Sequence, residues 1–111
     1  MKTQPISSQN FTAGEIKFVN RHFVSKPFDK ISLYLPQQLG NSLNRAAEKI
    51  SGKDYDIFVM RSWKNHHIFE IRADKEYCTK SNSNSVFVHE NLIAEAFESA
   101  ISKAIKLFEK K

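Results

Sequence analysis

The last third of the chain carries the clearest alternation of apolar and polar positions. Glutamates fall early in this segment and lysines fall late, an order that complements the dipole of a helix. The pattern predicts a helix over about residues 90–109. Its apolar face is formed by Leu92, Ile93, Ala96, Phe97, Ala100, Ile101, Ala104, Ile105 and Phe108.

Apolar residues alternate with polar ones in the middle of the chain, which is typical of half-buried strands. Residues 55–63 predict one strand, and residues 68–73 predict a second strand after a hairpin loop at 64–67. Further strands are suggested by Tyr77-Cys78-Thr79 and Val86-Phe87-Val88. The Ser/Asn tract at 81–85 reads as an exposed loop tip. The pattern leaves open whether residues 76–88 form one strand, two strands or a loop.

The N-terminal segment is patterned less strongly. Residues 1–10 show no period and predict a mobile arm. Thr12 and Glu15 have the spacing of a capping box, which predicts a helix that continues to about Ser25. Residues 15–19 also alternate, so a strand is the alternative there.

A strand and a second helix are predicted next. Residues 30–35 alternate and read as a strand. Pro36 should end that strand and open a helix. Gly40 would lie in the first turn of this helix, and Gly52 is placed to end it with a left-handed residue.

Together these elements predict one α+β domain over residues 11–111, of a length usual for a single domain. The expected architecture is a two-layer sandwich in which helices cover a mostly antiparallel sheet of three to four strands. The expected order of elements is α-β-α-β-β-(β)-α.

The net charge of +5 lies wholly in the first 53 residues, because the remainder has as many acidic as basic residues. A basic half suggests contact with nucleic acid or an acidic protein surface, although the same charge also serves solubility. No apolar run is long enough to span a bilayer, and no stretch resembles a secretory signal. With a single cysteine as well, the chain is expected to be cytoplasmic.

Basic and aromatic residues are the candidate binding groups. If the first two predicted helices lie side by side, their outer faces form a basic stripe that could contact phosphates. A second group surrounds the only tryptophan. Trp63 either closes the core at the end of the sheet, which we favour, or is an exposed anchor for a base or a protein. The candidate macromolecule-binding residues are Lys17, Arg21, Arg45, Lys49, Arg61, Trp63 and Lys64.

Catalytic and metal-binding patterns are weak in this chain. His66 and His67 are adjacent, so on a strand they would point to opposite faces and could not easily share an ion. Cys78 has no base assigned beside it. The acidic pairs Asp54/Asp56 and Asp74/Glu76 are ordinary at strand ends. We therefore expect no catalytic residue, no metal and no cofactor.

Some segments resemble known families. The run LNRAAEKI, then DIFVM, HIFEI and LIAEAFESAISKAI, resembles small phage-encoded ABA sandwich proteins over roughly residues 39–108. That resemblance implies a mobile-element accessory protein of undefined activity. From Ile31 onward the order of elements also looks like the β-α-β-β-β-α domain of ribosome hibernation factors, which bind ribosomal RNA through basic helix faces.

The sequence thus favours a non-enzymatic protein that binds another macromolecule, encoded by a phage or mobile element and modulating or inhibiting a host protein. An RNA- or DNA-binding module that uses the basic helix face is the alternative. A small enzyme with an unrecognised site, built on a carboxylate pair or on His66 and His67, is the third hypothesis. The expected partner is a host protein or a nucleic acid, with no membrane, and a homodimer is compatible with the closing helix.

Overall fold

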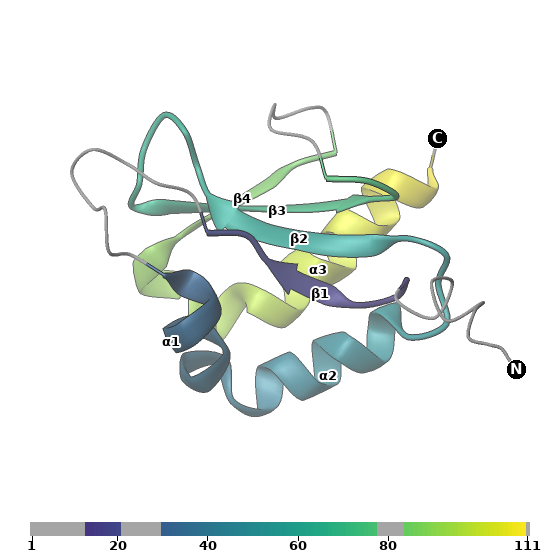
Figure 1. Ribbon diagram of the computed structural model, residues 1–111, viewed down its shortest axis with the longest axis horizontal. Helices are drawn as coiled ribbons and strands as arrows, with labels where there is room; N and C mark the ends of the chain where they lie inside the picture. Colours follow the sequence, from purple (N-terminus) through teal and green to yellow (C-terminus); the bar gives the residue numbers. More distant parts are fainter. Residues whose placement is uncertain (1–12, 21–29, 78–83, 111) are drawn as a thin grey trace, which may run out of the picture.

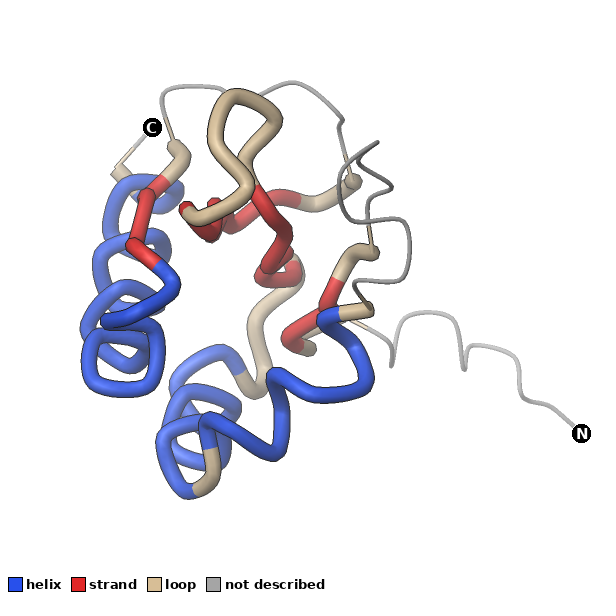
Figure 2. The backbone as a smooth tube through the Cα atoms, turned by 90° about the vertical axis from the view of Figure 1, so that its left-hand side faces the viewer, coloured by secondary structure: helices blue, strands red, loops and turns tan. Residues whose placement is uncertain are grey.

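The computed structural model describes residues 13–20, 30–77 and 84–110. All three α-helices lie on one side of a single sheet (Figures 1 and 2). The elements in chain order are β1 (Ile16–Phe18), α1 (Ile31–Leu39), α2 (Asn41–Ile50), β2 (Asp56–Arg61), β3 (Ile68–Asp74), β4 (Val86–His89), the 3-10 turn η2 (Glu90–Leu92) and α3 (Ile93–Glu109). The expected α+β class, with helices layered on a sheet, is confirmed.

The sheet is mixed, which corrects the expectation of a mostly antiparallel one. Its four strands follow the order β1-β2-β3-β4. β1 runs parallel to β2, whereas β2–β3 and β3–β4 are antiparallel. The parallel pairing exists because the chain crosses over through α1 and α2 between these two strands.

The core lies between the sheet and the helices. Alternate residues of β2, β3 and β4 face the helices because side chains along a strand point to opposite sides. The centre of the core is formed by Ile57, Val59, Phe69, Ile71, Ala73 and Val88 from the sheet, with Leu35, Ile50, Ile93, Phe97, Ile101 and Ala104 from the helices.

On the other face of the sheet, the central strands β2 and β3 are also buried, and they carry charge there. Phe58 and Met60 lie on this face beside Glu70 and Arg72, whose side chains are both fully buried. Their ion pair joins Arg72 Nη1 to Glu70 Oε2 over 3.2 Å. Ser85 donates a hydrogen bond of 2.6 Å to the same carboxylate oxygen.

The predicted first helix is wrong, because its described part is strand β1. Gly14 has φ +83°, which is incompatible with a helix, and a Cβ there would lie 3.0 Å from the carbonyl oxygen of Ile50. Glu15 accepts a hydrogen bond from the Ile57 amide and donates its own amide to Asp56 Oδ1. These bonds draw the segment to β2. The capping residue Thr12 and the expected helix end at Ser25 lie outside the described residues.

The predicted strand at 30–35 is also wrong, because these residues begin α1. Ile31, Leu35 and Leu39 are buried at a spacing of four residues, whereas Leu33 is 68% exposed. Pro36 therefore lies inside a helix rather than at its start. No side chain at Lys30 caps the helix, and Asn20 Oδ1 instead accepts the Ser32 amide at 3.0 Å.

The predicted second helix is divided in two. Gly40 has φ +56° and separates α1 from α2. Gly52 has φ +83° just after α2 ends, which confirms the left-handed residue expected there.

The C-terminal half agrees with the sequence pattern. β2, β3, β4 and the closing helix all form, and only the first turn of that helix is a 3-10 turn. The exposed tip expected at 81–85 is wrong for Asn84, which is 8% exposed. Tyr77 is not in a strand, and Cys78 and Thr79 lie outside the described residues.

Candidate functional site

A buried arginine organises one end of the sheet. Arg61 is the last residue of β2, and it follows Ile57 and Val59 on the helix-facing side. Its side chain is only 7% exposed. The guanidinium carbon lies 4.7 Å from the centre of the Phe69 ring, a cation–π distance. A charged side chain on the buried side of a strand requires hydrogen-bonding partners, and α1, the β2–β3 turn and η2 supply them.

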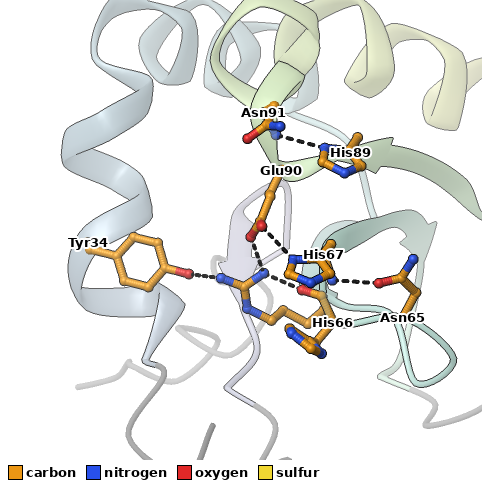
Figure 3. A network of polar contacts seen from close by, with 8 residues as sticks. Tyr34, Asn65, His66, His67, His89, Glu90 and Asn91 are labelled. Carbon is orange, nitrogen blue, oxygen red and sulfur yellow. Dashed lines mark hydrogen bonds and ion pairs between the residues drawn. The ribbon is translucent and has the colours of Figure 1, made fainter. Parts of the chain in front are cut away.

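The guanidinium of Arg61 binds groups that are far apart in the sequence (Figure 3). It donates to the hydroxyl of Tyr34 on α1 and to the carbonyl of His66 in the β2–β3 turn. It also donates to Glu90 Oε1 at the start of η2, over 3.0 Å. This side chain therefore ties α1, the turn and η2 to the end of β2.

Glu90 bridges the arginine to a histidine. Its Oε2 lies 2.7 Å from Nδ1 of His67 (Figure 3). Burial opposes ionisation of Glu90, but the hydrogen bonds from His67 and Arg61 and the charge of Arg61 outweigh burial and lower its pKa. Glu90 is thus held as a carboxylate between two donors.

Three histidine rings lie beside this bridge. The ring centres of His66 and His67 are 4.1 Å apart, and His67 stacks on His89 at 6.4 Å. His89 Nδ1 accepts the amide of Asn91, so this ring caps η2. The two adjacent histidines precede β3 in a turn, which allows their rings to meet instead of facing opposite sides of the sheet.

Trp63 lies in the same turn, two residues after Arg61, and is 55% exposed. Our preferred interpretation, that it closes the core, is therefore wrong. The strand ends at Arg61, so Trp63 no longer follows the alternation that buries Ile57 and Val59. Hydrogen bonds from Ser62 N to Ile68 O, at 2.8 Å, and from His67 N to Asn65 Oδ1, at 2.9 Å, hold the turn. Lys64, also exposed, is next to the tryptophan.

The predicted basic stripe does not form. Lys17 lies on β1, facing the side of the sheet opposite the helices, and binds Asp56 at 3.2 Å. Arg45 and Lys49 lie on α2, on the helix side, and both approach Glu98 of α3, at 2.7 and 3.9 Å. Arg21 lies outside the described residues. Of the candidate residues that the structure describes, Arg61, Trp63 and Lys64 gather at the end of β2, and Arg45 and Lys49 gather on α2 beside Glu98.

Asp54, Asp56 and Asp74 of the two acidic pairs have structural partners. Asp56 is 5% exposed and receives the Glu15 amide as well as Lys17. Asp54 approaches Lys75 at 3.5 Å, and Asp74 accepts the Lys75 amide. Within residues 13–20, 30–77 and 84–110, no group of three or more His, Cys, Asp or Glu is placed to hold a metal ion.

A hollow lies elsewhere on the surface, between α2 and α3. It is lined by Lys49, Glu95, Glu98, Ser99 and Ser102, and none of these belongs to the Arg61 network. Over the same described segments, no helix combines the length and apolar character that a bilayer crossing requires.

Sequence reasoning identified Arg61 and Trp63 but missed Tyr34 and Glu90. One signal was present in the sequence. Arg61 continues the alternation of Ile57 and Val59, so a charge stands where a core residue is expected, and such a charge needs a buried acceptor. The pattern does not say which acceptor, because the partners come from segments distant along the chain.

No family model, no curated protein and no solved structure matches this chain.

Proposed function

We propose that this chain is a non-enzymatic binding protein whose protein partner docks on the end of the sheet, with Trp63 as the anchor. The observation that carries the proposal is an exposed tryptophan on a turn that is fixed from several sides. Tryptophan, tyrosine and arginine dominate the binding energy of protein interfaces, and a rigid anchor loses little entropy on binding.

The state of the neighbouring charges supports binding rather than catalysis. Arg61 is buried, and its charge is balanced by Glu90 at 3.0 Å. Glu90 in turn holds His67. Because Arg61, Glu90 and His67 bind one another, they hold the β2–β3 turn in position. That the partner is a host protein and that the chain is a phage or mobile-element modulator stay predictions from the sequence.

Nucleic-acid binding is the second candidate, because Trp63 and Lys64 are exposed side by side. A base could stack on the indole while the lysine meets a phosphate. The separation of Lys17 from Arg45 and Lys49 onto opposite sides of the sheet speaks against a wider basic surface.

The test uses a photo-crosslinking residue in place of Trp63, compared with the same residue in place of Glu48, an exposed position on α2. In cells of the source organism, we expect one protein to be trapped from position 63 and not from position 48. Equal trapping from both positions, or trapping of nucleic acid alone, would contradict the proposal.

Trp63 is the only tryptophan, so its fluorescence reports on the proposed contact directly. Titration with the purified trapped protein should shift the emission to shorter wavelength and saturate. We expect Trp63→Ala to weaken binding by about 2 kcal/mol or more. The free energy of unfolding of the Trp63→Ala variant should differ from that of wild type by less than about 0.5 kcal/mol, because the Trp63 side chain lies largely outside the core. Emission that is unchanged by that protein but shifted by mixed oligonucleotides would favour the nucleic-acid candidate.

A further inference from the structure

Two stacked histidine rings at the end of the sheet use the same ring nitrogen in opposite ways (Figure 3). Nδ1 of His67 lies 2.7 Å from Oε2 of Glu90, which is a carboxylate oxygen. Nδ1 of His89 lies 3.1 Å from the backbone nitrogen of Asn91. A carboxylate only accepts hydrogen bonds, and a backbone amide only donates them. Nδ1 therefore carries a proton in His67 and none in His89.

This assignment gives the two rings different responses to acid. A second proton on the ring of His67 goes to Nε2 and leaves the bond to Glu90 in place. The ring of His89 can take a second proton only at Nδ1, on the lone pair that accepts the Asn91 amide. Histidine is the side chain that ordinarily gains its charge between about pH 8 and about pH 5. Mild acid therefore breaks the bond between Asn91 and His89 and keeps the bond between His67 and Glu90.

The bond from Asn91 to His89 holds the start of η2. His89 is the N-cap residue of this 3-10 turn, and Glu90 is the first residue inside it. Glu90 is also the residue that binds Arg61 and His67. The planes of the two stacked rings lie within 13° of each other and their centres are 6.4 Å apart, so two cations there repel. Because His67 keeps its bond to Glu90, His89 is the ring that moves away.

Other ionisable groups surround the two rings and Glu90. They are Tyr34 from α1, Arg61 from β2, Lys64 and His66 from the turn, and Glu70 and Arg72 from the face of β3 on which His89 lies. Both carboxylates are already engaged by an arginine, at 3.0 Å for Glu90 and 3.2 Å for Glu70. The ring centre of His66 is 4.1 Å from that of His67, so a proton on His66 adds to the repulsion. α3 packs against the opposite face of β4, where Val88 is buried.

We propose that His89 is a proton-controlled cap that regulates the turn carrying Trp63. When His89 is neutral, it fixes η2, and Glu90 then holds the turn through its bonds to the arginine and to His67. When His89 is protonated, the η2 amide is released, the ring is repelled by His67, and the contacts of Glu90 loosen. Mild acid should then weaken binding of a protein partner to Trp63, a consequence that rests on the proposed function. The release of the cap is a property of the free protein.

The test follows the backbone amide of Asn91 by NMR in the full chain, between about pH 8 and about pH 5. In the wild type, we expect its protection against hydrogen exchange, corrected for the intrinsic effect of pH, to fall about fivefold or more. The fall should follow the titration curve of the His89 ring protons. In His89→Asn the protection should stay constant, because asparagine caps helices and does not titrate. His67→Gln is the matched control, which removes the neighbouring histidine and keeps the response of Asn91.

Trp63 is the only tryptophan, so time-resolved fluorescence anisotropy measures how freely the turn moves. We expect the indole to become more mobile in acid in the wild type and to stay unchanged in His89→Asn. With the protein trapped from position 63, the affinity of the wild type should fall about fivefold or more over the same pH range, and that of His89→Asn should not.

The proposal is overturned if Asn91 responds to pH equally in wild type and His89→Asn, or if the cap is lost and the indole mobility is unchanged. Photo-crosslinking that traps no protein from position 63 would contradict the proposed function and leave the result for the cap standing. A cap that does not respond to pH would leave the docking of a partner on Trp63 standing, so the two failures are distinguishable.

Discussion

The sheet buries two arginines, Arg61 and Arg72. The acidic partner of Arg72 is buried inside the protein, whereas the acidic partner of Arg61 reaches the surface. Arg72 pairs with Glu70 on the same strand, two residues away, and both side chains are fully buried. Arg61 pairs with Glu90 across 29 residues of sequence, and Glu90 remains 27% exposed. Ser85, the residue before β4, donates a hydrogen bond to the first pair. The second links three segments beneath an exposed tryptophan.

The two ion pairs differ in the segments of the chain that they connect. A buried ion pair costs desolvation that its attraction only partly recovers, so neither pair is evidence of stability by itself. The Arg72 pair joins two residues of one strand, and both side chains are fully buried. The Arg61 pair recruits Tyr34 and the β2–β3 turn as well, and so it sets the position of residues that face solvent.

The largest effect is expected at the fully buried pair. Arg72→Met leaves the Glu70 carboxylate buried beside a neutral side chain, and we expect a loss of about 3–5 kcal/mol in the free energy of unfolding. Urea denaturation of the purified variant measures this loss. The double variant Glu70→Leu with Arg72→Met should recover most of it, because no charge then stays buried. A single variant as stable as wild type would show that Glu70 is readily solvated or neutralised.

A smaller effect is expected at the sheet end. Arg61→Lys keeps the charge but cannot hold Tyr34, His66 and Glu90 together, and it should cost about 2–3 kcal/mol. The cost is lower than for Arg72 because Glu90 can be hydrated. Urea denaturation measures this cost as well. Tyr34→Phe removes only one of the hydrogen bonds of Arg61, and we expect it to lower the free energy of unfolding by about 1 kcal/mol. If Arg61→Lys exceeded Arg72→Met in cost, the contrast between the two arginines would be reversed.

The smallest effect is the pH dependence of the same site. The pKa of Glu90 in the folded protein lies below its usual value of 4.5, so the unfolded chain binds this proton more readily. The stabilisation is fully present above the unfolded pKa and is lost as the pH falls through the folded pKa. Glu90→Gln should therefore lose stability relative to wild type at neutral pH, and the gap should narrow in acid. Thermal unfolding from pH 7 down to about pH 3 measures it. A difference in stability between Glu90→Gln and wild type that does not change with pH would contradict the lowered pKa of Glu90.

The sequence pattern predicted the C-terminal half well because its pairings are local. β2, β3 and β4 follow one another as antiparallel neighbours, and the apolar face of α3 is long and regular. In the N-terminal half, Ile31 and Leu35 satisfy both a two-residue and a four-residue period. Only burial of Leu39 and exposure of Leu33 decide for the helix. Strand β1 depends on hydrogen bonds to β2, which short-range patterns do not contain.

The candidate site was predictable only in part for the same reason. Trp63 and Arg61 stand out by residue type and position in the alternation. Their arrangement depends on Tyr34 and Glu90, which reach the sheet end from separate elements. The predicted basic stripe relied on two helices lying side by side, and one of them is a strand on which Lys17 faces the other side of the sheet.

The parallel pairing of β1 with β2 also has a kinetic consequence. Ile16 aligns with Ile57, so this pairing closes a long loop, whereas the strands after it join neighbours in sequence. Long-range contacts form late because loop closure costs entropy before any contact compensates it. A folding chain would thus assemble β2, β3, β4 and α3 first and add β1 last. The ribosome makes β1 before these elements, and yet β1 would be the last of them to take its place.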